Sequence, residues 1–129
     1  VGTAEVTLYF PDESGVLQPE ERTLELYEGD TQVSAVARAL ENGPLDSDLA
    51  PAFPEGFRPR SVWLEEDICY VNLSSGLLGD LPEDAALDMA LEALTRSLCA
   101  LENVSETRFL VDGEYASCYG PVALEVPEK

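Results

Sequence analysis

The sequence predicts an α+β domain, a two-layer sandwich in which two helices pack on one face of a mixed sheet. Three observations predict it. Apolar and polar residues alternate in five short runs, apolar residues recur at helical spacing in two longer runs, and the runs follow one another in the order ββαββαβ. A chain of 129 residues is long enough to bury one hydrophobic core, so residues 1–129 are expected to form a single domain.

The first two strands are predicted to form a hairpin. Val6, Leu8 and Phe10 alternate with less apolar residues, and the turn formers at residues 11–15 end this run. In residues 22–27 the two leucines share one face of a second strand. A period of two in both runs favours pairing across the intervening loop.

The next segment is predicted to be an amphipathic helix. Its apolar residues are spaced at i, i+3, i+4 and i+7, namely Val33, Val36, Ala37 and Leu40. Asp30 or Thr31 is placed to cap its start. The helix is expected to end at Asn42-Gly43-Pro44, because glycine adopts the left-handed conformation after a last turn and proline cannot continue the helix.

A long loop and a second hairpin are expected next. Residues 45–59 are rich in proline, which indicates a loop within the domain and not a linker between domains. Alternating runs at residues 61–65 and 68–73 then predict two strands joined tightly through Glu66-Asp67.

The second helix has the strongest pattern in the chain. Asp80 and Glu83 match a capping box, and Pro82 suits a first turn. One helical face then carries Leu87, Ala90, Leu91, Leu94, Leu98 and Leu101. The short apolar run at residues 108–111, ended by Asp112-Gly113, predicts a fifth strand, and the tail leaves room for a sixth.

Composition excludes several classes of function. Twenty-six acidic residues oppose seven basic ones, a net charge of −19, so nucleic acid and anionic membrane surfaces would be repelled. The surplus acid is interpreted as a solvated surface, with steering of a basic partner as the alternative. The chain has no long apolar run, so no direct membrane insertion by this segment is expected. Because it starts at Val1 without a leader-like segment, we expect a mature form or a fragment.

Catalytic chemistry is not expected either. The chain has no histidine and its one lysine is Lys129, so it cannot build a Ser-His-Asp, Cys-His or buried-lysine nucleophile. No glycine-rich phosphate loop follows a strand, so no nucleotide or other cofactor is predicted. We therefore predict that the domain is not an enzyme.

Metal and disulfide patterns are weak. Asp12-Glu13 and Asp46-Ser47-Asp48 lack the spacing of a calcium loop and are interpreted as acids that cap turns, so no metal site is predicted. Cys69, Cys99 and Cys118 are an odd number. Cys69 and Cys99 are predicted to be buried as small apolar residues, while a disulfide between any pair stays open.

Four large aromatic residues suggest a binding surface. They occupy strand positions that face away from the expected helices, namely Tyr9, Tyr27, Trp63 and Tyr70. Tyrosine and tryptophan are enriched in binding hot spots, so these rings are candidate partner-binding residues. The alternative is that the C-terminal tail or the proline-rich loop covers this face and the rings form a minor core.

Six short motifs occur in an order that is found in a known family. They are Val6-Thr7-Leu8-Tyr9-Phe10-Pro11-Asp12, Glu21-Arg22, Leu40-Glu41-Asn42-Gly43-Pro44, Phe53-Pro54-Glu55-Gly56, Tyr70-Val71-Asn72-Leu73-Ser74 and Phe109-Leu110-Val111-Asp112-Gly113. In this order and spacing the chain resembles the GerMN domain family of sporulation and spore germination proteins. The resemblance covers about residues 5–113 and leaves residues 114–129 as a C-terminal tail. One departure is Glu66-Asp67, where such domains often carry a glycine.

The resemblance implies a fold similar to the ring-building motifs of secretion systems. It also implies an extracytoplasmic protein, secreted or held to the membrane by a lipoprotein anchor in its full-length form. Such a protein would bind other envelope or sporulation-complex proteins between the two membranes of the developing spore. The family supplies no catalytic residues to carry over.

Two functions remain open from the sequence. The first is a protein-protein interaction module that helps to assemble an envelope complex. The second is a carbohydrate- or cell-wall-binding domain, since exposed tyrosine and tryptophan rings also stack on sugars.

Overall fold

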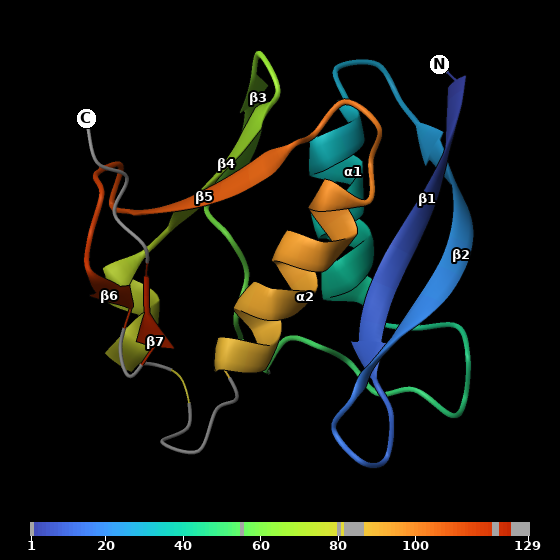
Figure 1. Cartoon of the computed structure of the whole chain (residues 1–129), viewed down its shortest axis with the longest axis horizontal. Coiled ribbons are helices and arrows are strands. Elements are labelled where there is room, and N and C mark those ends of the chain that lie inside the picture. The colour runs from blue at the N-terminus through green and yellow to red at the C-terminus, as the bar shows by residue number, and fades with distance from the viewer. Residues whose placement is uncertain (1, 55, 80, 82–86, 120–121, 125–129) are drawn as a thin grey trace.

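The computed structural model describes residues 2–54, 56–79, 81, 87–119 and 122–124 (Figure 1). Its elements are β1 (Gly2–Pro11), β2 (Leu17–Leu26), α1 (Gln32–Asn42), β3 (Ser61–Glu65), β4 (Ile68–Leu73), α2 (Leu87–Cys99), β5 (Glu106–Val111), β6 (Cys118–Tyr119) and β7 (Val122–Ala123). The α+β class and the order ββαββαβ are confirmed. The structure adds a short 3-10 helix at Ser75–Gly79 and the β6–β7 pair in the tail.

The strands divide into separate sheets. β1 and β2 pair along their whole length as an antiparallel hairpin, from Gly2 opposite Leu26 to Pro11 opposite Leu17. β3 pairs antiparallel with β4, and β4 pairs parallel with β5, so the mixed sheet contains these three strands and not all five. The helices lie between the two sheets in Figure 1, and α1 contacts β1, β2 and β3. The sequence predicted one sheet. In the structure the β1–β2 hairpin and β3 belong to different sheets, and α1 packs against both.

The core is built from the positions that periodicity predicted. All the apolar positions expected on the two helices are buried, namely Val33, Val36, Ala37, Leu40, Leu87, Ala90, Leu91, Leu94, Leu98 and Leu101. The hairpin contributes Val6, Leu8 and Phe10, and every second residue of β4 is fully buried. One face of each larger sheet is therefore covered by helices.

The first helix is capped as the sequence suggested. Between the two candidates, Thr31 is the N-cap: its side chain accepts a hydrogen bond from the Ser34 N–H at 3.2 Å, and the Ser34 hydroxyl oxygen accepts one from the Thr31 N–H at 3.0 Å. Asp30 instead accepts bonds from Arg38 and from the Tyr27 N–H. Gly43 ends the helix at a φ of 91°. The capping box predicted at Asp80, Pro82 and Glu83 lies outside the described residues.

The loop before β3 and the tail are both anchored in the core. Phe53 and Phe57 are buried with their ring centroids 5.0 Å apart, edge to face, and Tyr119 lies 6.5 Å from Phe57. The Tyr119 hydroxyl donates to the Ser74 carbonyl oxygen at 2.7 Å. These contacts fix the segments that flank the mixed sheet.

Candidate functional site

Two of the four predicted aromatic residues meet on the outer face of the mixed sheet. Trp63 of β3 and Tyr70 of β4 are directly opposite each other in the strand register. Their rings stack at a centroid distance of 5.5 Å and an interplanar angle of 17°. Cys69 and Val71, on either side of Tyr70, are fully buried. Successive strand residues point to opposite faces of a sheet. The stacked pair therefore faces away from the helices.

A third ring, Tyr115, joins this pair. A hollow of about 640 Å³ is lined by the three rings and bordered by Glu65 and Glu114. We call Trp63, Tyr70 and Tyr115 the aromatic cluster. Tyr115 comes from the tail after β5, so the tail contributes one ring to the outer face of the mixed sheet. Tyr115 itself remains 44% exposed.

The turn after β5 explains how Tyr115 reaches the sheet. Asp112 and Gly113 both have positive φ, 52° and 85°, and Val111 and Glu114 exchange backbone hydrogen bonds on either side of them. This is the behaviour of an Asp-Gly turn of type I′, which folds the chain back on itself. The Asp-Gly pair was therefore a usable sequence signal for Tyr115, although the sequence analysis used it only to end the strand.

Hydrogen bonds hold the polar ends of the cluster. The Trp63 Nε1–H donates to Glu65 at 3.3 Å, and Nη1 of Arg108 donates to the Tyr115 hydroxyl at 3.5 Å. Arg108 also pairs with Glu106, which raises the pKa of the guanidinium. The neighbouring Tyr115 hydroxyl raises the pKa of the Tyr70 hydroxyl above its ordinary value, so Tyr70 is uncharged at neutral pH. The rings are thus positioned by the protein before any ligand binds.

Tyr9 and Tyr27 lie elsewhere. Tyr9 is half-buried on β1, where the Arg96 guanidinium of α2 lies 6.0 Å from its ring centroid. Tyr27 follows β2, is 59% exposed, and donates its hydroxyl proton to Glu25 at 2.7 Å. Tyr9 lies on the hairpin sheet and Tyr27 directly follows it, so the structure brings only Trp63 and Tyr70 together from the four predicted residues.

The acidic pairs considered for metal binding act in turns. Asp12 accepts hydrogen bonds from the backbone N–H groups of Ser14 and Val16, and Asp46 accepts one from the N–H of Asp48. The Val16 N–H is the largest of several bonds that lower the pKa of Asp12. In the part of the chain that the structure describes, no group of three or more metal-ligating side chains comes together.

The cysteines are free thiols in the structure. Cys69 is fully buried, and burial, with a smaller effect of Cys99, raises the pKa of its thiol to about 12. Its thiolate is therefore scarcely populated at neutral pH. Cys99 is half-buried with its sulfur 3.2 Å from the Thr107 hydroxyl, and Cys118 is exposed.

The motifs that carry the family resemblance hold the fold together. Asn72 accepts a hydrogen bond from the Gly113 N–H at 2.8 Å, and Asp112 accepts bonds from the N–H and hydroxyl of Ser75. Arg22 donates to the Gly43 carbonyl oxygen at the end of α1. These residues join segments far apart in the chain, so the resemblance rests on structural positions.

Among the described helices, none combines the length and apolar character needed to cross a membrane.

The chain is similar to a known family of domains. A model of the Germane family, described as sporulation and spore germination, matches residues 7–117. None of the curated proteins compared with the chain matches it.

Solved structures give the fold. The first GerMN domain of the sporulation protein GerM from Bacillus subtilis is 15% identical with a TM-score of 0.67, and the match covers 96% of this chain and 94% of that one. The tandem GerMN domains of the same protein give 14% identity and a TM-score of 0.70 over 98% of this chain and 45% of that one, so the chain spans less than half of the tandem structure. A candidate lipoprotein from Clostridium perfringens is 21% identical with a TM-score of 0.54, over 92% of this chain and 80% of that one.

Proposed function

Because the chain belongs to the Germane family of sporulation and spore germination domains, as its resemblance to GerMN domains predicted, we propose that it is a non-catalytic assembly module. It binds another protein of the cell envelope during sporulation or germination, and it does so outside the cytoplasm. The observation that carries the proposal is the aromatic cluster on the outer face of the mixed sheet.

The cluster has the physical character of a protein-docking surface. Trp63, Tyr70 and Tyr115 combine large apolar faces with polar groups at their edges, a combination enriched in binding hot spots. The stacking of Trp63 on Tyr70 and the hydrogen bonds of Trp63 and Tyr115 limit the side-chain freedom that binding would remove. Pre-organised rings lose less entropy on association, so each contact contributes more to affinity.

Location outside the cytoplasm is part of the proposal. The similar protein from Clostridium perfringens is named as a candidate lipoprotein, which supports membrane attachment of the full-length protein through a lipid. The domain itself would then project from the membrane surface and present the cluster to a partner.

A carbohydrate or cell-wall ligand is the second candidate. The hollow beside the rings is bordered by the carboxylates of Glu65 and Glu114, which can accept hydrogen bonds from sugar hydroxyls. Stacked aromatic rings with acceptors at their rim suit a sugar as well as a peptide.

One experiment separates the two candidates. The domain is incubated in parallel with insoluble peptidoglycan and with a detergent extract of envelope proteins from sporulating cells. We expect a defined protein to be captured by the wild type and by Tyr27→Ala, and to be lost with Tyr115→Ala. Tyr27 is the matched control, because it is an exposed tyrosine outside the cluster.

Retention on peptidoglycan that disappears with Tyr115→Ala would replace the protein-binding proposal with the carbohydrate one. Capture that is equal in all three proteins would contradict both. Circular dichroism of each variant shows whether its fold is intact.

A further inference from the structure

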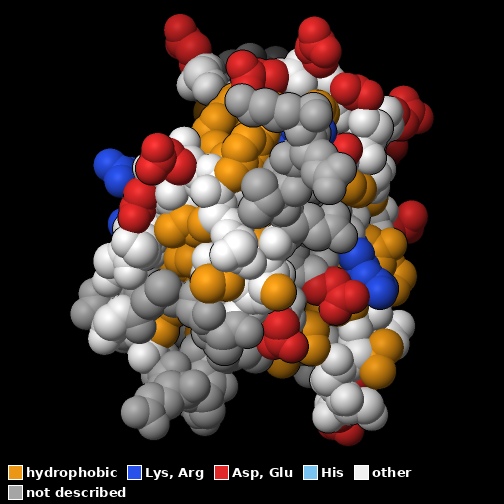
Figure 2. Space-filling model, turned by 60° about the vertical axis from the view of Figure 1, so that its left-hand side comes forward, with side chains coloured by type: hydrophobic (Ala, Val, Ile, Leu, Met, Phe, Trp, Pro, Cys, Tyr) orange, Lys and Arg blue, Asp and Glu red, His pale blue; other side chains and the backbone are white. Residues whose placement is uncertain are grey.

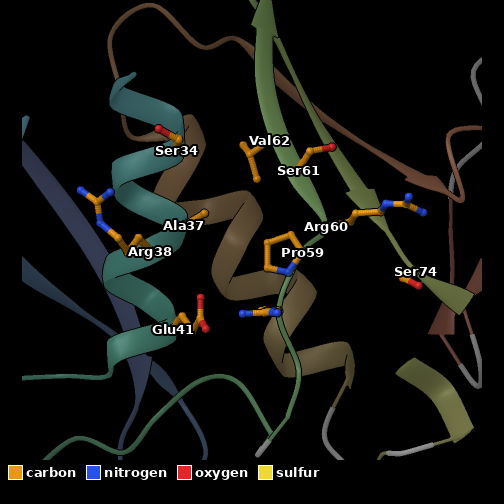
Figure 3. Close-up of a pocket in the computed structure, with 10 residues that line it drawn as sticks. Ser34, Ala37, Arg38, Glu41, Pro59, Arg60, Ser61, Val62 and Ser74 are labelled. Atoms are coloured by element: carbon orange, nitrogen blue, oxygen red, sulfur yellow. The ribbon is translucent and has the colours of Figure 1, made fainter. Parts of the chain in front are cut away.

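A second groove lies on the side of the molecule between α1 and the edge of the mixed sheet. It has a volume of about 560 Å³. One wall is α1, with Ala37, Arg38 and Glu41, and the other is the segment of residues 58–62 that leads into β3 (Figure 3). Trp63 points to the outer face of the sheet while Val62 lines this groove, so the groove is distinct from the aromatic cluster.

The edge of β3 is available along this groove. β3 is the end strand of its sheet and pairs with β4 alone. Every second residue of an antiparallel strand turns its N–H and C=O away from its partner. No other residue in the described part of the chain makes a backbone hydrogen bond to that outer edge. An unpaired edge of this kind can accept one more extended strand.

Several basic residues line the groove of this strongly acidic molecule. Arg38, Arg58 and Arg60 line it, which is three of the seven basic residues in a chain with a net charge of −19. Arg38 is paired with Asp30 at 3.1 Å. Arg58 and Arg60 are exposed, and neither forms an ion pair with a described residue. Two guanidinium groups are thus left to meet carboxylates from outside.

Small side chains leave room in the groove beside Arg58 and Arg60. Ala37 on α1 faces Val62 of β3 across the groove, as Figure 3 shows. The one acidic side chain of the lining, Glu41, comes from the helix wall.

We propose that this groove binds an extended, acidic peptide segment of a partner protein, which adds as a strand to the free edge of β3 while its carboxylates pair with Arg58 and Arg60. A long polyanion such as nucleic acid does not suit it, because the net charge of −19 repels a chain of phosphates that extends beyond the groove. A short segment with a few carboxylates meets only the local positive charge. The proposal does not depend on the aromatic cluster.

The test uses fluorescence anisotropy with a labelled short peptide of alternating valine and glutamate. Binding is expected at low salt and is expected to weaken as salt rises. Replacing both arginines, Arg58→Ala with Arg60→Ala, is expected to weaken it about tenfold, since each exposed pair contributes about 1 kcal/mol or less. Arg96→Ala is the matched control, because Arg96 is an exposed arginine on α2, outside the groove.

A second probe tests the strand pairing itself. The same peptide with N-methyl groups along its backbone keeps its charge and loses its N–H donors. We expect it to bind much more weakly, and we expect amide exchange in β3 to slow only with the unmethylated peptide. Tyr115→Ala should leave binding unchanged, which separates this proposal from the one on the aromatic cluster.

Several outcomes would overturn the proposal. Equal affinity of the wild type and the double arginine variant would remove the role of the groove. Equal affinity for the methylated peptide would leave only a charge effect, and tighter binding of a short oligonucleotide than of the peptide would point to a general anion surface. A labelled second copy of the domain that displaces the peptide would assign the groove to self-association.

Discussion

Tyr119 is the residue that ties the tail to the body of the domain. It is 1% exposed, its ring contacts Phe57, and its hydroxyl donates to the Ser74 carbonyl oxygen across 45 positions of sequence. Burial raises the pKa of this hydroxyl, so it remains a hydrogen-bond donor at neutral pH. Tyr119 therefore anchors β6 to the core.

Removing this hydroxyl gives the first prediction. Tyr119→Phe keeps the ring and leaves the Ser74 carbonyl oxygen without its donor, so the free energy of unfolding should fall by about 1 kcal/mol. Urea denaturation followed by circular dichroism measures the change. Tyr115→Phe is the control, since its hydroxyl lies at the surface, and an equal loss in the two variants would refute the assignment.

The stacking of Trp63 on Tyr70 gives the second prediction. Trp63 is the single tryptophan of the chain, so its fluorescence reports on this site alone. Tyr70→Ala removes the stacked ring, and we expect Trp63 emission to shift to the red and quenching by acrylamide to increase. Tyr27→Ala should change neither, and an unchanged emission in Tyr70→Ala would contradict the stacked geometry.

At the scale of elements, α2 is joined to the edge of β1 by a buried hydroxyl. Ser97 is fully buried, and its Oγ accepts a hydrogen bond from the Tyr9 N–H at 3.0 Å. A helix side chain here takes the place that a neighbouring strand would fill. This contact protects the β1 edge from pairing with another chain.

The third prediction tests that contact. Ser97→Ala leaves a backbone N–H without its acceptor, so we expect the free energy of unfolding to fall by about 1–3 kcal/mol. Thr95→Ala is a matched change on the same helix, where the hydroxyl donates only to the Leu91 carbonyl oxygen of its own helix. Alanine has a higher helix propensity than serine or threonine, so helix propensity cannot cause either loss. A Thr95→Ala variant as unstable as Ser97→Ala would therefore contradict a specific role for the contact with Tyr9.

The elements themselves were predictable because they depend on local patterns. Spacing gave both helical faces, and Thr31 and Gly43 gave the ends of α1. Glu66 has a φ of 58°, a conformation that favours glycine, which fits the glycine common at this connection in GerMN domains. Glu66-Asp67 is visible in the sequence as a departure, but its physical cause lies in the backbone conformation of Glu66.

The placement of the elements was much less predictable. Periodicity assigns a face to each strand but does not say which strands pair, so it could not show that Tyr9 and Trp63 lie on different sheets. The groove of Arg58 and Arg60 forms because α1 packs near β3. A long loop separates these two elements in the sequence. Contacts of this kind are set by tertiary packing.

At the scale of the whole molecule, the surface is dominated by acid. Figure 2 shows carboxylate side chains around much of the visible face, with apolar patches between them and few basic groups. Four carboxylates are nonetheless held in defined hydrogen bonds with lowered pKa values, namely Asp12, Glu20, Asp30 and Asp112. Burial alone would raise the pKa of Glu20, but the bonds that it accepts from Asp46, Arg22 and Leu45 outweigh this effect.

These carboxylates give the fourth prediction, a loss of stability in acid. Their folded-state pKa values lie below the ordinary values of 3.8 for aspartate and 4.5 for glutamate. Their stabilising effect is therefore complete above those ordinary values and is lost as the pH falls through the lower folded values. Urea denaturation across this acidic range, at high salt to screen the net charge, should show the free energy of unfolding falling with pH.

One variant identifies the contribution of Asp112. Hydrogen bonds from the Ser75 hydroxyl and N–H are the main cause of its lowered pKa, so Asp112→Asn should show a shallower decline in acid. Asp88→Asn removes an exposed carboxylate that makes no hydrogen bond within the described residues, and it is the comparison variant for the loss of one negative charge. The same slope in wild type and Asp112→Asn would contradict this assignment.

The central claim is that a partner protein docks on the aromatic cluster, and site-specific photocrosslinking in sporulating cells of the source species tests it most directly. A photoreactive benzoylphenylalanine replaces Tyr115 in one full-length variant and Tyr27 in another, both exposed tyrosines. We predict a discrete protein adduct from position 115 and none from position 27. Adducts of equal yield from both positions, or from position 27 alone, would contradict the claim.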